Sequence, residues 1–267
     1  MNAIFDAVPL ELERIVFTRE QLVILDDVSL VVARGEHWLV LGANGSGKTT
    51  LLRIASMYEH PTSGSVRVLG ETLGRTDVRV LRRRVGYSSA ALGAQFRPAL
   101  TAIEVVVTAK YAALEPWWHQ YTADDRARAH ACLDRMGVGV LADRSLATLS
   151  SGEQQRVFLA RTLMNDPGVI LLDEPSARLD LGGREQLVAA LADLATQADG
   201  PPFVLVTHHV DEIPAGVSHV MLLRHGRVLA AGPLDSTLTS ESLSECFGMP
   251  LELEHRSDGR FSAFARR

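Results

Sequence analysis

The sequence of 267 residues predicts an α/β fold in which helices cover a mainly parallel sheet. Two observations support this prediction. Short apolar runs that read as buried strands alternate along the chain with longer amphipathic runs that read as helices. One of these strands also leads directly into a glycine-rich loop that opens a helix. The length suits one large domain or two small ones, with room for a sizeable hydrophobic core.

The elements expected along the chain follow from hydrophobic periodicity and capping signals. The expected strands span 25–30, 36–41, 65–69, 169–172, 203–207, 220–223 and 228–230, the last in a hairpin around His225 and Gly226, and a further strand ends at Tyr87. The expected helices span 49–57, 101–113, 124–136, 151–164 and 184–195, the second opened by a capping box at Thr101.

One segment of the chain differs in character from the rest. Residues 95–149 lack strand signals, so we expect a helical insertion that includes the next helix and spans about 95–164. It divides a core made of residues 10–94 and 165–235, and residues 236–267 form a short C-terminal extension. We expect all of these parts to form one domain over residues 1–267.

The composition is that of an ordinary globular protein, with 46% hydrophobic and 22% charged residues. The chain has 27 basic and 32 acidic residues and a formal net charge of −5, so we expect no broad basic surface and no nucleic-acid partner. Only Lys48 and Lys110 are lysines, and the other 25 basic residues are arginines. We expect Lys110 and the run Arg82-Arg83-Arg84 to be solvated.

Nothing in the sequence predicts export or insertion into a membrane. The longest uncharged stretch, residues 85–96, is far shorter than the ~20 apolar residues of a spanning helix. The N-terminus lacks the cationic start and apolar run of a secretory signal. Cys132 and Cys246 fit no metal or redox pattern, so we expect two reduced thiols in a cytoplasmic protein.

A phosphate-binding loop follows the strand 36–41. Residues 42–49 read Gly-Ala-Asn-Gly-Ser-Gly-Lys-Thr and match the pattern G-x-x-x-x-G-K-[ST] between a strand and a helix. The glycines let successive backbone N–H groups point at phosphate oxygens, and the helix N-terminus adds its positive dipole end. We expect Lys48 to reach the β- and γ-phosphates of a nucleotide and Thr49 to hold Mg²⁺.

Two carboxylates, Asp173 and Glu174, follow the apolar strand 169–172. A buried strand delivers them to the C-terminal edge of the sheet, where open α/β sheets bind their ligands. Asp173 therefore suits Mg²⁺ binding, directly or through water. Glu174 is placed to orient or deprotonate an attacking water.

A third motif lies between the other two. Residues 149–156 read Leu-Ser-Ser-Gly-Glu-Gln-Gln-Arg and resemble the LSGGQ-type signature of ABC ATPases. Ser150 lies 102 residues after Lys48 and 23 before Asp173, which is the order and approximate spacing of that family. Residues 175–180, which end in Asp180, resemble its D-loop, and His208 resembles its switch histidine. The resemblance covers about residues 10–235 in collinear order.

The resemblance implies the phosphate-loop NTPase fold of ABC ATPases, with an N-terminal antiparallel β subdomain. It also implies ATP and Mg²⁺ as ligands and a head-to-tail homodimer, or a pair with a related ATPase subunit, in which the signature acts in trans. The residues that it assigns to ATP binding are Gly42, Ala43, Asn44, Gly45, Ser46, Gly47, Lys48, Thr49 and Thr50. It assigns Ser150, Ser151, Gly152 and Glu153 to the signature. It assigns Lys48, Glu174 and His208 to catalysis.

The sequence departs from the family pattern at three places. Ser151 and Glu153 replace a glycine and a glutamine of the signature. Arg19 stands where the family places an aromatic residue against adenine, and a guanidinium can also stack on a base. The strand that ends at Tyr87 leads to two serines in place of the Q-loop glutamine. Gln95 is a possible substitute, and so is Ser88 or Ser89.

The function implied is that of the cytoplasmic ATPase subunit of an ABC transporter, peripheral on the inner face of the membrane and bound to a separate permease. The Q-loop variant, the pair Trp117-Trp118 and a Thr-His-His strand end are similar to those of iron- or molybdate-type importer ATPases. The tryptophan pair either packs within the insertion or, if exposed, suits a docking contact with the permease. The alternative is a soluble ABC ATPase without a permease, in a regulatory or repair role.

Overall fold

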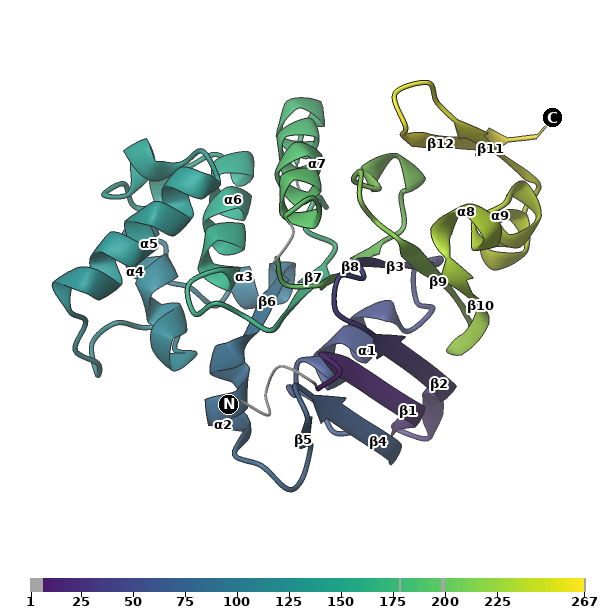
Figure 1. The fold of residues 1–267 in the computed structure, drawn as a ribbon, viewed down its shortest axis with the longest axis horizontal. Coiled ribbons are helices and arrows are strands. Elements are labelled where there is room, and N and C mark those ends of the chain that lie inside the picture. Colours follow the sequence, from purple (N-terminus) through teal and green to yellow (C-terminus); the bar gives the residue numbers. More distant parts are fainter. Residues whose placement is uncertain (1–6, 178, 198–199, 267) are drawn as a thin grey trace.

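The computed structural model describes residues 7–177, 179–197 and 200–266 of the chain. Within these residues, helix α1 (Lys48–Ala55) lies between two β-sheets at the centre of the fold (Figure 1). Its apolar side chains Leu51, Leu52 and Ile54 are fully buried against both sheets. A helical part lies on one side of this core, and the C-terminal elements lie on the other.

The larger sheet has six strands in the order β10-β9-β3-β8-β7-β6. Their bounds are β3 (Trp38–Leu41), β6 (Val85–Ser89), β7 (Val169–Asp173), β8 (Phe203–Thr207), β9 (His219–Arg224) and β10 (Arg227–Pro233). Adjacent strands from β6 to β9 are parallel, and β10 is antiparallel to β9. His225 and Gly226, both at positive φ, form the turn between β9 and β10. The predicted parallel sheet and its hairpin are confirmed.

The smaller sheet is antiparallel, in the order β2-β1-β4-β5. It consists of β1 (Leu10–Arg19), β2 (Leu22–Val32), β4 (Ser63–Val68) and β5 (Glu71–Thr72). Leu10, Leu12, Ile15 and Phe17 of β1 are buried, with a register shift that keeps the apolar side chains on one face. The antiparallel N-terminal part of the predicted fold class is therefore confirmed.

The helical part contains α3 (Ala90–Gly93), α4 (Ala102–Val107), α5 (Ala123–Arg135) and α6 (Ser151–Thr162), with 3-10 turns at Thr108–Tyr111, Gly139–Leu141 and Leu146–Thr148. The capping box at Thr101 is present. The helix expected to reach residue 113 instead changes to 3-10 geometry at Thr108, whose hydroxyl bonds the Val105 carbonyl. The chain then leaves the helix at Ala112, which has a left-handed backbone.

Helix α6 approaches the large sheet closely. Gly86 of β6 faces the last turn of α6, and a Cβ at this glycine would lie 2.8 Å from the Thr162 carbonyl oxygen. Any larger residue would therefore push the helix away from the strand. The remaining short elements before β6 are α2 (Val78–Leu81) and a 3-10 turn at Arg82–Arg84.

The C-terminal elements follow β10 and return over the large sheet. They are α8 (Leu234–Thr237), α9 (Ser240–Phe247), β11 (Leu251–His255) and β12 (Phe261–Ala265), and the last two form a hairpin. Helix α7 (Leu181–Ala195) precedes β8, and the 3-10 turn η5 (Val210–Glu212) follows it. None of the helices in the described residues is long and apolar enough to cross a membrane.

The basic residues that were expected to be solvated are partly or fully exposed, and they also make specific contacts. The Lys110 side chain is 32% exposed, and its Nζ lies 2.5 Å from Asp125 Oδ2. Two arginines of the run 82–84 also contact tyrosine rings. The Arg82 guanidinium lies 4.3 Å from the centre of the Tyr58 ring, and the guanidinium of Arg83 lies 5.4 Å from that of Tyr111.

The two cysteines are both free and buried. Burial raises the pKa of the Cys132 thiol, and it raises the pKa of Cys246 to about 11. Thiols with raised pKa values are poor nucleophiles, so neither resembles a reactive cysteine.

His37 is a buried histidine in the core, with its ring 4.5 Å from that of Phe203. Its Nδ1 is buried and has no hydrogen-bond partner among the residues that the structure describes. Burial lowers the pKa of His37, and a bond to the Ala195 backbone opposes this only in part. The folded protein therefore favours the neutral ring.

The lowered pKa predicts a stability that falls with acidification. The unfolded chain takes up a proton at His37 near pH 6.5 while the folded chain does not, so the free energy of unfolding decreases as the pH falls through that value. We expect the fall in Tm between pH 7.5 and 5.5 to be about 2–4 °C smaller in His37→Phe than in the wild type. His60→Asn, at an exposed position, is the control. Identical pH dependence of Tm in wild type and His37→Phe would contradict the assignment.

Candidate active site

The phosphate loop connects β3 to α1 and holds Lys48 in a buried position. Lys48 is 4% exposed, and its Nζ donates to the carbonyl oxygens of Gly42 at 2.7 Å and Ala43 at 3.0 Å. Gly45 and Gly47 have φ values of 79° and 103°, which residues with a Cβ rarely adopt. Burial lowers the pKa of Lys48, and the carboxylates of Glu174 and Asp173 oppose this shift.

The two residues predicted to bind Mg²⁺ lie next to each other. Thr49 Oγ1 donates to Asp173 Oδ1 at 3.1 Å, although the two residues are 124 positions apart. Burial raises the pKa of Asp173 to about 6, and the bond from Thr49 opposes the rise. A hydroxyl and a carboxylate are the oxygen ligands that Mg²⁺ prefers, so the two side chains fit this ion.

Glu174 and His208 meet beside Lys48. Glu174 Oε1 lies 3.2 Å from His208 Nδ1 and 3.9 Å from Lys48 Nζ. Glu174 has a φ of 46°, which is unusual for a residue with a side chain and is a form of strain found at functional sites. The three side chains expected to act in catalysis therefore converge, although they come from three different loops.

The signature motif begins α6, as expected. Ser150 caps this helix by accepting from Glu153 N, and the Glu153 carboxylate accepts in return from Ser150 N at 2.7 Å. This replacement of the family glutamine thus completes a capping box. The first turn of α6 lies beside the first turn of α7, where Gly152 and Gly183 approach closely. Asp180 caps α7 in turn by accepting from Gly183 N at 2.8 Å.

The helix of the signature borders a cavity rather than the phosphate loop of its own chain. The cavity has a volume of about 110 Å³, and its lining includes Ser151, Gln155, Phe158 and Glu174. Ser150 and Ser151, at the N-terminus of α6, are exposed. Arg178, in the D-loop, lies outside the described residues.

Two residues assigned by position have other contacts in this structure. Arg19 donates to Glu59 at 2.9 Å, and its guanidinium lies 5.4 Å from the Phe17 ring centre. Phe17 is itself buried in the core. Gln95 is exposed and donates to the Ala91 carbonyl at 3.2 Å. Adenine stacking by Arg19 and a Q-loop role for Gln95 stay predictions.

The two serines that replace the Q-loop glutamine are buried at the end of β6. Ser89 pairs with Asp173 in the strand register, and its hydroxyl accepts from Leu92 N at 3.1 Å and so caps α3. Ser88 pairs with Leu172 in the same register. The pairing of β6 with β7 therefore places both serines directly beside the strand that ends in Asp173, whereas Gln95 lies beyond the end of β6.

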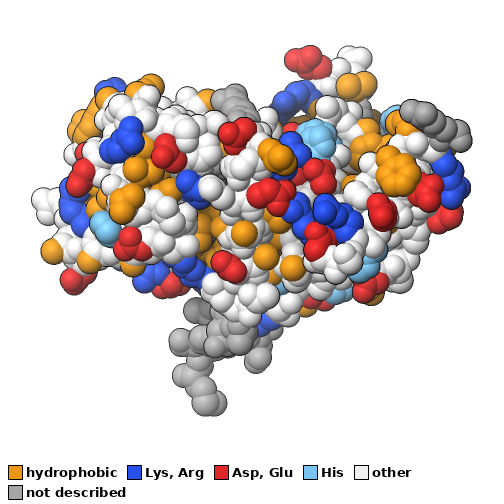
Figure 2. Space-filling model, turned by 90° about the horizontal axis from the view of Figure 1, so that it is seen from above, with side chains coloured by type: hydrophobic (Ala, Val, Ile, Leu, Met, Phe, Trp, Pro, Cys, Tyr) orange, Lys and Arg blue, Asp and Glu red, His pale blue; other side chains and the backbone are white. Residues whose placement is uncertain are grey.

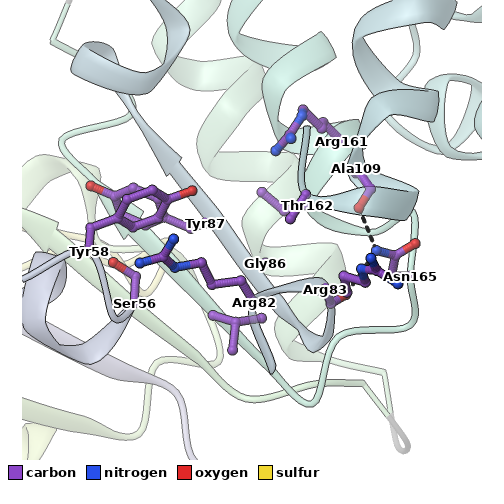
Figure 3. A pocket seen from close by; sticks show the side chains of 12 residues that line it. Ser56, Tyr58, Arg82, Arg83, Gly86, Tyr87, Ala109, Arg161, Thr162 and Asn165 are labelled. Carbon is purple, nitrogen blue, oxygen red and sulfur yellow. Dashed lines mark hydrogen bonds between the residues drawn. The ribbon is translucent and has the colours of Figure 1, made fainter. Parts of the chain in front are cut away.

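Two features of the site were not foreseen. Helix α9 packs behind the phosphate loop, with Cys246 Sγ 3.9 Å from the Leu41 carbonyl oxygen. A cavity between the core and the helical part is lined by Tyr58, Arg82, Tyr87 and Arg161 (Figure 3). Burial lowers the pKa of Arg161 to about 10. No sequence pattern marks either feature, because both arise from contacts between distant segments.

A parallel sheet, a phosphate loop with a buried lysine after β3 and a carboxylate pair at the end of β7 define an ATP-hydrolysing protein of the phosphate-loop class. The family model described as ABC transporter matches residues 11–177. The chain belongs to the ABC transporter family as an ATP-binding subunit.

Alignments with known proteins of similar sequence cover nearly the whole chain. An uncharacterized ABC transporter ATP-binding protein, YlmA of Bacillus subtilis, is 36% identical over 94% of this chain and 96% of its own length. The hemin import ATP-binding protein HmuV of Rhodococcus jostii is also 36% identical, over 98% of this chain and 87% of its own. A dimeric ATP-binding cassette bound to ADP and phosphate has a TM-score of 0.73 at 28% identity, covering 84% of this chain and 98% of that one.

The two lysines provide a matched test of the phosphate loop. We expect Lys48→Arg to weaken ATP binding by about tenfold or more, because a planar guanidinium does not fit the buried space between the Gly42 and Ala43 carbonyls. Lys110→Arg, on the half-buried pair with Asp125, should bind ATP as the wild type does. Titration calorimetry with ATP measures both. Unchanged affinity in Lys48→Arg would contradict the role of this lysine.

Proposed function

We propose that this subunit hydrolyses ATP to drive transport through a separate membrane permease. The observation that carries the proposal is that Glu174 Oε1 lies within 4 Å of both Lys48 Nζ and His208 Nδ1, at one edge of the sheet. Relatives whose names describe import of hemin, cobalt and phosphonates support the import direction. We further propose that residues 1–267 act as a single ATPase domain at the cytoplasmic face of the membrane.

The hydrolytic step follows from the positions of these side chains. Glu174 accepts the proton of a water aligned with the γ-phosphate, while Lys48 stabilises the charge that develops on the phosphate oxygens. His208 holds the Glu174 carboxylate and senses the γ-phosphate. Thr49 and Asp173 would hold Mg²⁺, which would supply positive charge to neutralise the phosphate oxygens.

The signature in this proposal acts on the nucleotide of a second subunit. Ser150 is exposed at the N-terminus of α6, and the first turn of that helix offers backbone N–H groups and a positive dipole end. A head-to-tail dimer, with itself or with a related subunit, brings this end to the γ-phosphate of the partner. The dimeric cassette among the similar structures supports this arrangement.

The permease contact in this proposal lies on the helical part. Trp117 and Trp118 are 56% and 87% exposed, so most of the Trp118 side chain and about half of Trp117 are accessible to a partner. Arg97 lies 4.1 Å from the centre of the Trp117 ring and pairs with Glu115. An exposed aromatic pair beside an arginine has the composition of a binding hot spot. The cavity around Arg82 and Arg161 marks the nearby junction between the core and the helical part (Figure 3).

Glu174→Gln tests the hydrolytic role. The amide keeps the shape of the side chain but cannot accept a proton, so we expect hydrolysis to fall by about 100-fold or more. ATP binding should persist, and an ATP-bound dimer should accumulate in size-exclusion chromatography. Glu71→Gln, at an exposed position on the edge strand β5, is the control. Near-normal hydrolysis by Glu174→Gln would remove the assigned base.

Replacing the tryptophan pair tests the permease contact. We expect Trp117→Ala with Trp118→Ala to keep the ATPase rate of the purified subunit and to weaken its association with cell membranes by about tenfold. Val140→Ala, which is 94% exposed on another turn of the helical part, is the matched control. The measurement is the fraction of subunit that sediments with membranes. Wild-type sedimentation of the double variant would exclude this docking surface, and absence of membrane association in the wild type would favour a soluble ABC ATPase.

A further inference from the structure

The C-terminal hairpin β11–β12 lies beside the turn that follows the switch histidine (Figure 1). Phe261, the first residue of β12, is buried and belongs to the same hydrophobic cluster as Val210 and Ile213 around that turn. Figure 2 views the face that carries α7 and the hairpin, where acidic and basic side chains are interleaved. The hairpin is therefore packed onto the loop between β8 and β9.

Arg260, the residue before β12, forms polar contacts with two other elements. Its Nη2 donates to the backbone carbonyl of Asp211 in η5, and its Nη1 pairs with the Glu185 carboxylate on α7. Arg184, also on α7, pairs with Asp211 Oδ2 at 2.9 Å. Arg260 therefore contacts the backbone of the η5 turn, and Arg184 contacts a side chain of the same turn.

The η5 turn is in turn bonded to the end of β8. Glu212 is 4% exposed, and its Oε2 accepts from Thr207 Oγ1 at 2.5 Å. The same hydroxyl accepts from His209 N at 3.1 Å. Arg184 Nε lies 3.6 Å from the other Glu212 oxygen. The residues on both sides of His208 are therefore fixed through Glu212.

This chain of contacts connects the C-terminal hairpin to the catalytic cluster. It runs from Arg260 through the backbone of Asp211 to Glu212, then to Thr207 and His209, and it ends at His208 beside Glu174. We propose that Arg260 is a positioning residue that holds His208 in register with Glu174. The inference rests on the proposed function, in which His208 and Glu174 act on the γ-phosphate.

The position of Arg260 distinguishes it from the groups that contact nucleotide. It is 75 residues from Glu185 in the sequence and 49 from Asp211, and it lies after the segment matched by the family model. Its loss would leave the phosphate loop unchanged, since its partners among the described residues, Glu185 and Asp211, lie outside that loop. A positioning role predicts a change in the rate of the chemical step without a change in ATP affinity.

The test compares two arginines of the same hairpin. We expect Arg260→Ala to lower kcat for ATP hydrolysis by about tenfold with KM for ATP unchanged. Arg260→Lys, which keeps a donor for the Asp211 carbonyl, should restore part of the rate. Arg256→Ala removes only a pair with Asp258 inside the hairpin turn and should leave kcat unchanged. Wild-type kcat in a folded Arg260→Ala would overturn the inference.

A double-mutant cycle shows whether Arg260 acts through the turn. The Glu212→Gln substitution already weakens the contact with Thr207. When Arg260→Ala is added to Glu212→Gln, we expect kcat to fall by less than about twofold relative to Glu212→Gln alone. Equal, multiplicative losses in both backgrounds would overturn the inference. If Arg260→Ala does not fold, Arg260→Lys and Arg260→Gln are put through the same cycle. Failure of the proposed function is separate, because it would appear as residual hydrolysis in Glu174→Gln with the wild-type hairpin.

Discussion

The site depends on the parallel register of three adjacent strands. Leu41 of β3 pairs with Thr207 of β8, and Asp173 of β7 pairs with Val206 of the same strand. The three strands therefore end at one level, and the loops that follow them deliver Lys48, Glu174 and His208 to a common point. The buried ammonium of Lys48 is stabilised there by two carbonyl oxygens and two carboxylates, which offset part of its desolvation.

Much of the fold and of this site could be predicted from the sequence, for a physical reason. The phosphate loop, the acids after β7 and the histidine after β8 each follow an apolar run, and hydrophobic burial fixes where such a run ends. The signature could also be placed, because its short motif resembles that of the family and lies between the other two motifs at the expected spacing. These features use residues that are close in sequence.

The features that sequence reasoning missed depend on contacts between distant segments. Lys110 meets Asp125 only after α4 and α5 pack together, and Arg82 reaches Tyr58 across a turn between the two sheets. The C-terminal hairpin was not predicted, although residues 251–254 alternate Leu and Glu, and its place in the fold is set by the contacts of Phe261 and Arg260. Neither periodicity nor propensity describes such contacts, because they form only when the whole chain has folded.

The close approach of Gly86 to Thr162 has a mechanical consequence. It fixes the last turn of α6 against β6, while the first turn, which carries the signature, lies 11 residues away. At 1.5 Å per residue that distance is about 16 Å, so a pivot of roughly 10° about the glycine would move the signature by about 3 Å. A displacement of that size makes or breaks a hydrogen bond. A small rotation of the helical part about this glycine would therefore change how far Ser150 reaches from the sheet.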